Sequence, residues 1–229
     1  MTMRAEPMTD ALAGQWHHHL LSASASAALS AEVWLRAAPR SQDRCIDLGA
    51  GVGMLTVPLS REVAEMVAVE PSKALAARLA ARAREHGASE IRMETVPITE
   101  LVMPRQSCDL VVSGLALHHC ENAEKRALVA RALRWLRPGG RLVIADLMPE
   151  RKGSAGRRGF RLGGPDSSGR GRLDRSAGRF IPSTLHALRE TTATGSFWAE
   201  AFEDAGFKTM GHRQPLPGIG VVWGTADPN

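Results

Sequence analysis

A run of nine residues, Cys45–Gly53, constrains the fold of this chain more than any other feature. It begins as a short apolar strand and continues into a turn with glycine at positions 49, 51 and 53. The apolar stretch 54–60 that follows predicts a helix. Glycine is needed where a backbone turns sharply or must approach a ligand without an intervening side chain. The order of strand, glycine turn and helix therefore predicts a parallel sheet with a ligand at its edge.

A second predicted strand, 67–69, ends at Glu70, twenty-one positions after Gly49. At about this spacing a carboxylate reaches the two ribose hydroxyls of a bound nucleoside. A dinucleotide site would place its third glycine at position 54, which is Met54 here. Asp47, two residues before Gly49, suits a ligand with a cationic ammonium better than a pyrophosphate. Together these residues predict a nucleoside cofactor that carries positive charge.

The segment Asp47–Gly53 with Glu70 resembles the first motif of the class I S-adenosylmethionine (SAM) dependent methyltransferases. Segment 108–119, which ends in Ala-Leu-His-His, resembles the family's fourth strand and the loop beyond it. Segment 133–146 resembles the helix, Pro-Gly-Gly turn and fifth strand. These motifs are most similar to those of the family's small-molecule branch, which includes the methyltransferases of ubiquinone and menaquinone biosynthesis. The resemblance covers residues 43–148 strongly and 196–226 more loosely.

This resemblance and the alternation of strands and helices imply a Rossmann-like α/β fold. We expect a seven-stranded, mainly parallel sheet with helices on both faces, an N-terminal helical cap, and 45–49 as a central strand. Helices are predicted over 72–85, from residue 121 or 122 to about 136, and over 196–205, with a closing hairpin of strands 207–210 and 220–224. The expected parts are a cap (1–42), a SAM-binding core (43–148), a flexible basic insertion rich in Gly and Arg (149–181), and the last helix and closing strands of the same domain (182–229).

The resemblance implies that SAM contacts residues at the ends of the predicted strands. Asp47 would set its ammonium group, and Glu70 would hold the ribose hydroxyls. After the third strand the family usually places an aspartate beside adenine, but that position is Pro97 here, which leaves the backbone N–H of Ile98 for this contact. The full predicted set is Asp47, Gly49, Ala50, Gly51, Glu70, Pro71, Ile98, Ser113 and Leu115, of which Ser113 and Leu115 would border the sulfonium.

His118 and His119 follow the fourth predicted strand, at the sheet edge where open α/β folds bind ligands. One of them could accept a proton from the methyl acceptor, or they could line the pocket instead. Asp146, at the end of the fifth predicted strand, is expected to be a turn residue. Three consecutive histidines, 17–19, point in different directions on a helix, so no metal site is predicted.

Composition narrows the class of protein. No apolar run approaches the roughly 20 residues needed to cross a bilayer, and the first residues lack the architecture of a signal peptide. Three cysteines, 45, 108 and 120, lie in or beside predicted strands without a Cys-x-x-Cys pair. This pattern predicts buried free thiols and a cytoplasmic location.

The net charge of +5 is concentrated in one segment. Residues 151–180 hold nine of the 29 basic side chains and two of the 24 acidic ones, so the remainder is nearly neutral. An arginine–glycine run can hold RNA phosphates. Few aromatic residues interleave here, however, and Ser-Gly-Leu-Ala stands where a base-flipping motif would follow the fourth strand. The segment is therefore interpreted as a flexible insertion or a lid over the substrate.

The sequence predicts methyl transfer from SAM to a small organic acceptor, with no nucleic acid and no membrane as partner. Two alternatives stay open: an RNA methyltransferase or RNA-binding module that uses 151–180, and a SAM-binding protein without catalysis. The acceptor, the atom methylated (O, N or C) and the oligomeric state are not indicated by the sequence.

Overall fold

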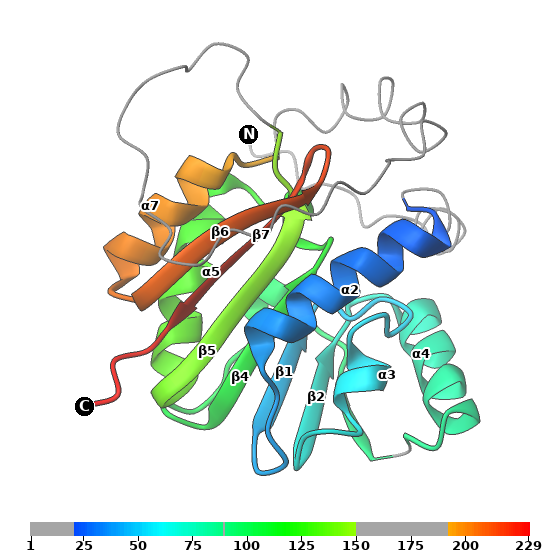
Figure 1. The fold of residues 1–229 in the computed structure, drawn as a ribbon. Helices are drawn as coiled ribbons and strands as arrows, with labels where there is room; N and C mark the ends of the chain where they lie inside the picture. Colours follow the sequence, from blue (N-terminus) through cyan, green and yellow to red (C-terminus); the bar gives the residue numbers. More distant parts are fainter. Residues whose placement is uncertain (1–20, 89, 150–191) are drawn as a thin grey trace, which may run out of the picture.

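The computed structural model describes residues 21–88, 90–149 and 192–229, which form one seven-stranded sheet covered by helices (Figure 1). The strands are β1 (Arg44–Leu48), β2 (Glu65–Val69), β3 (Ile91–Glu94), β4 (Cys108–Gly114), β5 (Leu136–Leu147), β6 (Lys208–Leu216) and β7 (Ile219–Thr225). The helices are α2 (Ala23–Ala37), α3 (Thr56–Leu59), α4 (Lys73–Glu85), α5 (Asn122–Trp135) and α7 (Gly195–Ala205), with short 3-10 turns η1 (Ile98–Glu100) and η2 (Leu117–His119). The histidines at 17–19, the first half of the expected cap and most of the expected insertion lie outside the described residues.

The strand order is β3-β2-β1-β4-β5-β7-β6, with β1 in a central position. The first five strands are parallel, so that Ile46 of β1 lies between Val67 of β2 and Val111 of β4. Strand β7 runs antiparallel to both β5 and β6. The predicted fold class, a mainly parallel Rossmann-like sheet closed by an antiparallel hairpin, is confirmed.

Alternation along the strands places apolar side chains in a core on each face of the sheet, because successive side chains of a strand point to opposite faces. Ile46 and Leu48 belong to the core shared with α5 and α7. Cys45 belongs to the core shared with α2 and α3, and α4 packs beside α3 on the same face. Figure 1 shows α2, α3 and α4 on one side of the sheet and α5 and α7 on the other. The three cysteines are buried and free, as predicted.

Side-chain caps begin two of the predicted helices. The Ser72 hydroxyl accepts the N–H of Leu75 at the start of α4, and the Thr194 hydroxyl accepts the N–H of Phe197 at the start of α7. Helix α7 ends at Gly206, whose φ of +99° provides the left-handed cap. Within the described chain, no helix combines the length and hydropathy that a membrane span requires.

Two predicted elements differ in the structure. The helix expected over 54–60 is only the four-residue α3, with residues 51–55 still in turns. The Pro-Gly-Gly segment is not a separate turn between α5 and β5, because that helix ends at Trp135 and Leu136 is already extended. Pro138 disfavours helical geometry for the residue before it. The N–H of Gly139 and the carbonyl of Gly140 then pair with residues 227 and 226, so the segment becomes the start of β5.

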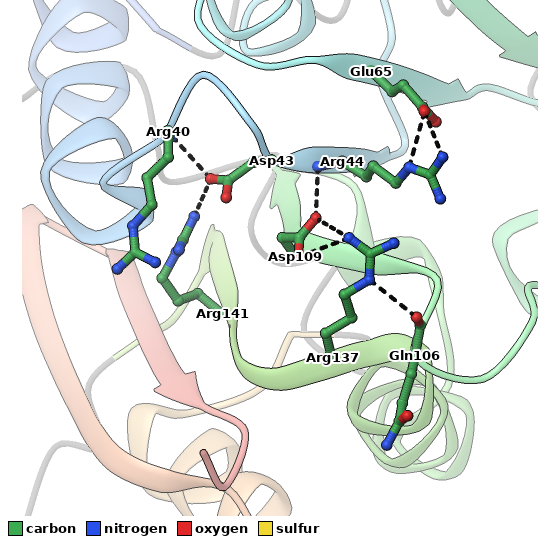
Figure 2. A network of polar contacts seen from close by, with 8 residues as sticks. All are labelled: Arg40, Asp43, Arg44, Glu65, Gln106, Asp109, Arg137 and Arg141. Atoms are coloured by element: carbon green, nitrogen blue, oxygen red, sulfur yellow. Dashed lines mark hydrogen bonds and ion pairs between the residues drawn. The ribbon is translucent and has the colours of Figure 1, made fainter. Parts of the chain in front are cut away.

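At the edge where β1, β4 and β5 begin, charged side chains join the three strands (Figure 2). The buried Asp43 carboxylate accepts the backbone N–H of Arg40 at 2.9 Å and pairs with the guanidinium of Arg141. Beside it, Asp109 accepts the N–H of Arg44 at 2.9 Å and pairs with Arg137 at 3.0 Å. The Asp43–Arg141 pair is the more buried of the two, so each of its charges is stabilised mainly by the other rather than by water.

We expect Arg141→Met to lower the free energy of unfolding by about 3 kcal/mol or more, because it leaves the Asp43 carboxylate buried without its cation. Urea unfolding measures this loss. The double variant Asp43→Asn/Arg141→Met removes both charges and should recover part of it. A double variant no more stable than Arg141→Met would contradict this account.

Candidate functional site

The turn between β1 and α3 needs glycine at all three of its glycine positions. Gly49, Gly51 and Gly53 have φ values of +78°, +55° and +83°, a region that other residues adopt only with strain. The N–H groups of Gly49 and Ala50 both donate to the carbonyl of Val69, at 2.9 and 3.0 Å. The turn is thereby fixed to the carboxyl end of β2, where Glu70 follows.

Gly49 is also the point at which two loops meet. A Cβ at Gly49 would lie 2.2 Å from the Cβ of Ala116, in the loop after β4, and 3.3 Å from the side chain of Ile98. A contact of 2.2 Å is impossible, so this position combines a left-handed backbone with complete steric exclusion. The close approach places the loop that carries His118 directly beside the glycine turn.

Gly49→Ala should therefore destabilise the protein by clearly more than its backbone conformation alone requires. Gly87 is the matched control: its φ is +67°, and a Cβ there meets nothing within 4 Å. We expect Gly87→Ala to cost about 1 kcal/mol from backbone strain. Gly49→Ala should cost at least twice that in urea unfolding, and equal losses in the two variants would refute the steric account.

Glu70 is held rigidly beside the turn. Its two carboxylate oxygens accept the N–H groups of Gly51 and Ser72, both at 2.9 Å, and the residue is 6% exposed. Burial raises the pKa of Glu70, and the two N–H donors oppose that rise. Each carboxylate oxygen keeps a second lone pair. Glu70 can therefore accept further hydrogen bonds from a ligand without leaving its place.

Asp47 is a buried acid whose charge is poorly compensated. It is 2% exposed, and its carboxylate accepts the hydroxyl of Thr56 at 2.6 Å. Among the described residues it forms no ion pair. Burial raises its pKa to about 7, the Thr56 hydrogen bond lowers it, and the nearby Glu70 adds to the rise. A cationic ligand group here would restore the ionised form.

The raised pKa of Asp47 makes stability depend on pH. Its pKa is about 7 in the folded protein against an ordinary value of 3.8, so the folded state binds the proton more tightly. The stabilisation from that proton is complete below about pH 4 and is lost as the pH rises through 7. We expect Asp47→Asn, which keeps an acceptor for Thr56, to be more stable than the parent at pH 8, by up to about 4 kcal/mol. The two proteins should converge near pH 4 in thermal unfolding, and an equal gap at both pH values would argue against the assignment.

Several predicted cofactor residues come together in space. Asp47, Gly49 and Ala50 line one small pocket. Its other lining residues, which the sequence prediction missed, are Val52, Met54, Leu55 and Gly114. Gly114 lies close to the glycine turn: a Cβ at this position would lie 2.8 Å from the Leu55 side chain. Pro71 is exposed beside Glu70.

Three of the predicted cofactor residues make contacts that support the fold: Ser113, Leu115 and Ile98. The Ser113 hydroxyl is fully buried and donates to the carbonyl of Leu48 at 2.8 Å, which ties β4 to β1. Leu115 is buried with a φ of +56°, and its side chain packs in the core beneath α2. Ile98 lies in η1, with its side chain against Gly49. Their predicted contacts with a cofactor stay predictions.

The two histidines after β4 differ sharply in environment. His118 is 1% exposed, and its Nδ1 lies 2.7 Å from Oδ1 of Asp146, which is equally buried. The same Oδ1 accepts the N–H of Leu147 at 2.8 Å. That oxygen acts as an acceptor, so Nδ1 of His118 is assigned as its donor; in the neutral ring Nε2 is then the acceptor nitrogen. His119 is exposed, with its ring centroid 4.1 Å from that of His118.

Asp146 is not the turn residue that the sequence analysis expected. It lies inside β5, paired with Gly220 of β7, because that hairpin strand extends the ladder to Leu147. The sequence did contain a signal for the His118–Asp146 pair. Because β4 and β5 are parallel neighbours, their carboxyl ends lie at one edge of the sheet, and each end carries one of these two residues. The structure thus brings together Asp47, Glu70, the glycine turn and a His–Asp pair along the carboxyl ends of β1, β2, β4 and β5.

Comparison with known proteins shows which families and structures this chain is similar to. Residues 45–140 match a family described as a methyltransferase domain. The uncharacterized methyltransferase YcgJ of Bacillus subtilis is 28% identical over 107 residues, 47% of this chain and 42% of that protein. The ubiquinone biosynthesis O-methyltransferase of Bradyrhizobium diazoefficiens is 33% identical over 106 residues, 45% of this chain and 40% of that protein. The uncharacterized RNA methyltransferase tlr0942 of Thermosynechococcus vestitus is 30% identical over 130 residues, 49% of this chain and 29% of that protein. The chain thus matches less than half the length of each of these relatives.

Solved structures share the fold over most of the chain. The DhpI–SAH complex superposes with a TM-score of 0.65 at 18% identity, covering 96% of this chain and 94% of that one. The [4+2]-cyclase SpnF superposes with a TM-score of 0.62 at 21% identity, covering 83% and 61%. At such identities the likeness establishes the fold. Since one of these neighbours is described as a cyclase, the reaction must be argued from the site.

Proposed function

We propose that the protein is a class I SAM-dependent methyltransferase that transfers a methyl group from SAM to a small organic acceptor, a proposal supported by the match of residues 45–140 to a methyltransferase domain. The family indicates SAM as the cofactor. The observation that carries the proposal is the pair of buried acids, Asp47 and Glu70, around a glycine turn that excludes a Cβ. Neither acid has a cationic partner among the described residues.

The residues present fit SAM. The nucleoside end offers ribose hydroxyls, which match the free lone pairs of the Glu70 carboxylate beside Gly51. The amino-acid end offers an ammonium group, which matches the uncompensated Asp47. Gly49 and Ala50 would lie against that end, and the N–H of Ile98 would meet adenine, where Pro97 offers no side-chain acceptor. When bound, SAM supplies an electrophilic methyl group on a sulfonium that is already a good leaving group.

His118 is the residue we assign to proton transfer. Its Nδ1–H is held by Asp146, so Nε2 is the atom that accepts a proton from an acceptor hydroxyl or amine. A methyl acceptor becomes a better nucleophile as it loses that proton. The main remaining task of the protein is to align acceptor and methyl and to exclude water. His119, exposed beside His118, is assigned to the lining of the acceptor pocket.

Glu70→Gln tests cofactor binding. We expect it to weaken binding of SAM and of S-adenosylhomocysteine by about 10-fold or more in titration calorimetry, because a charged acceptor of the ribose hydroxyls becomes neutral. Glu65→Gln is the control, since Glu65 is an exposed acid at the opposite end of β2, where its partner is Arg44. If the parent protein binds neither ligand, or if both variants bind like the parent, the proposal is wrong.

Release of S-adenosylhomocysteine with a library of small acceptors tests the second half of the proposal. Turnover on a hydroxyl or amine acceptor, lost in His118→Ala while SAM still binds, is the expected result. Tight SAM binding without turnover on any acceptor would instead indicate a protein that has lost catalysis.

One observation keeps a second function in view: the relative tlr0942 is described as an RNA methyltransferase. In this chain the basic segment 151–180 is the sequence feature that would serve such a role. RNA binding that falls steeply with salt and is lost on deleting 151–180 would favour this alternative. Retention of small-molecule turnover in the same deletion would favour the main proposal.

We also propose a cytoplasmic location, supported by the three free, buried thiols.

A further inference from the structure

A histidine ring fills a slot between two glycines, near the point where β5 ends. His212 of β6 lies against Gly195, the first residue of α7, and against Gly220 of β7. A Cβ at Gly195 would lie 2.7 Å from both Cε1 and Nε2 of the His212 ring, and a Cβ at Gly220 would lie 2.9 Å from Nε2. Neither glycine could therefore carry a side chain without displacing the ring.

The slot joins three parts of the chain. A Cβ at Gly220 would also lie 2.5 Å from Sδ of Met148, the buried residue that follows β5, so the His212 ring and Met148 meet over Gly220. The N–H of Met148 donates to the carbonyl of Gly218 at 2.8 Å, in the turn between β6 and β7. Figure 1 shows that α7 begins beside this end of the sheet. The His212 ring is thus placed to hold the end of β5, the β6–β7 hairpin and the start of α7 together.

The slot suits the ring only in its uncharged form. Nε2 of His212 is buried and has no hydrogen-bond partner among the residues that the structure describes. A protonated ring would carry a charged N–H there without an acceptor, which is costly. Burial lowers the pKa of His212. The ring also lies at the first residue of α7, and the positive end of a helix dipole disfavours a cation.

No acid in the described chain forms an ion pair that would compensate a charge on His212. Strand β7 has no charged side chain. On the other three elements, the first charged side chain met from the slot already has a partner: Asp146 of β5 with His118, Glu200 of α7 with Arg126, and Arg213 of β6 with Glu32. Arg213 follows His212 directly in β6, so its side chain points to the opposite face of the sheet.

An apolar side chain would fill the slot without an unpaired nitrogen. What imidazole adds is a charge that appears only in acid. We propose that His212 is a pH-sensitive clasp: its neutral ring, seated between Gly195 and Gly220, holds the start of α7 against the hairpin and the end of β5, and protonation of the ring releases this contact. Gly220 pairs with Asp146 in the sheet, so release would loosen the strand pair at the carboxyl edge. The clasp does not depend on the proposed function.

An NMR titration of the His212 ring in the full chain tests the seat of the ring. We expect a midpoint below the ordinary value of 6.5, because the seated ring resists protonation. Gly195→Ala should push the ring out of the slot and raise its midpoint toward 6.5, since α7 itself accepts alanine readily. Gly87→Ala, where a Cβ meets nothing within 4 Å, should leave the midpoint unchanged. A midpoint at or above 6.5 in the parent, or no change in Gly195→Ala, would overturn the proposal.

Amide hydrogen exchange, corrected for its intrinsic pH dependence, measures the release itself. The reporters are the N–H groups of Met148 and Trp198, which donate to the carbonyls of Gly218 and Thr194. For each unit by which the His212 midpoint lies below 6.5, their protection should fall about 10-fold once the ring is protonated. The N–H of Gly49, in the glycine turn, should keep its protection. Unchanged protection of both reporters across the His212 midpoint would refute the clasp.

His212→Gln provides a ring-free comparison, because glutamine does not titrate in this range. Its two reporter amides should lose no protection in acid, whereas His86→Gln, which changes an exposed histidine after α4, should behave like the parent. An equal acid loss in parent and His212→Gln would show that another group controls the release. Should His212→Gln fail to fold, Gly195→Ala decides, because a ring outside the slot should no longer make the protection of the reporters depend on its protonation.

Discussion

The contact between the backbone at Gly49 and the side chain of Ala116 sets the geometry of the carboxyl edge. Two loops from neighbouring parallel strands approach so closely that only a hydrogen fits between them at this point. Because the first loop also hydrogen-bonds to the end of β2 and the second carries His118, one contact fixes acid, turn and histidine relative to each other. The pocket is therefore a property of the backbone, and the side chains that line it are placed by that backbone.

Buried charge is distributed unevenly over the two edges of the sheet. At the amino edge, Asp43 and Arg141 neutralise each other and tie strands together (Figure 2). At the carboxyl edge, Asp47 and Glu70 are held by N–H and O–H donors, without a cation from the described chain. The first edge is electrostatically complete and supports the fold. The second edge retains a negative charge that a positively charged ligand can neutralise, which is how a fold of this kind separates structural support from binding.

Much of this could be predicted from the sequence, since the decisive signals are local. Alternating apolar residues, the glycine turn and the helices over 72–85 and 196–205 each depend on a few neighbouring positions, and the central place of 45–49 in a mainly parallel sheet was expected from the resemblance. What could not be predicted depends on distant contacts. Asp146 became a strand residue because β7 extends alongside it, and Ser113 is buried because Leu48 offers it a carbonyl. Lys125 occupies a buried position on the inward face of its helix, among apolar residues, which its charge alone would not predict.

The place of β7 has a consequence for how the sheet is completed during synthesis. This strand lies between β5 and β6, although it is the last of the three to leave the ribosome. Until residues 219–225 emerge, β5 presents an unpaired backbone edge that carries the buried Asp146 and the apolar run from Leu142 to Leu147. Such an edge is a template for pairing with other chains. Insertion of residues 219–225 between β5 and β6 therefore both completes the sheet and removes that exposed edge.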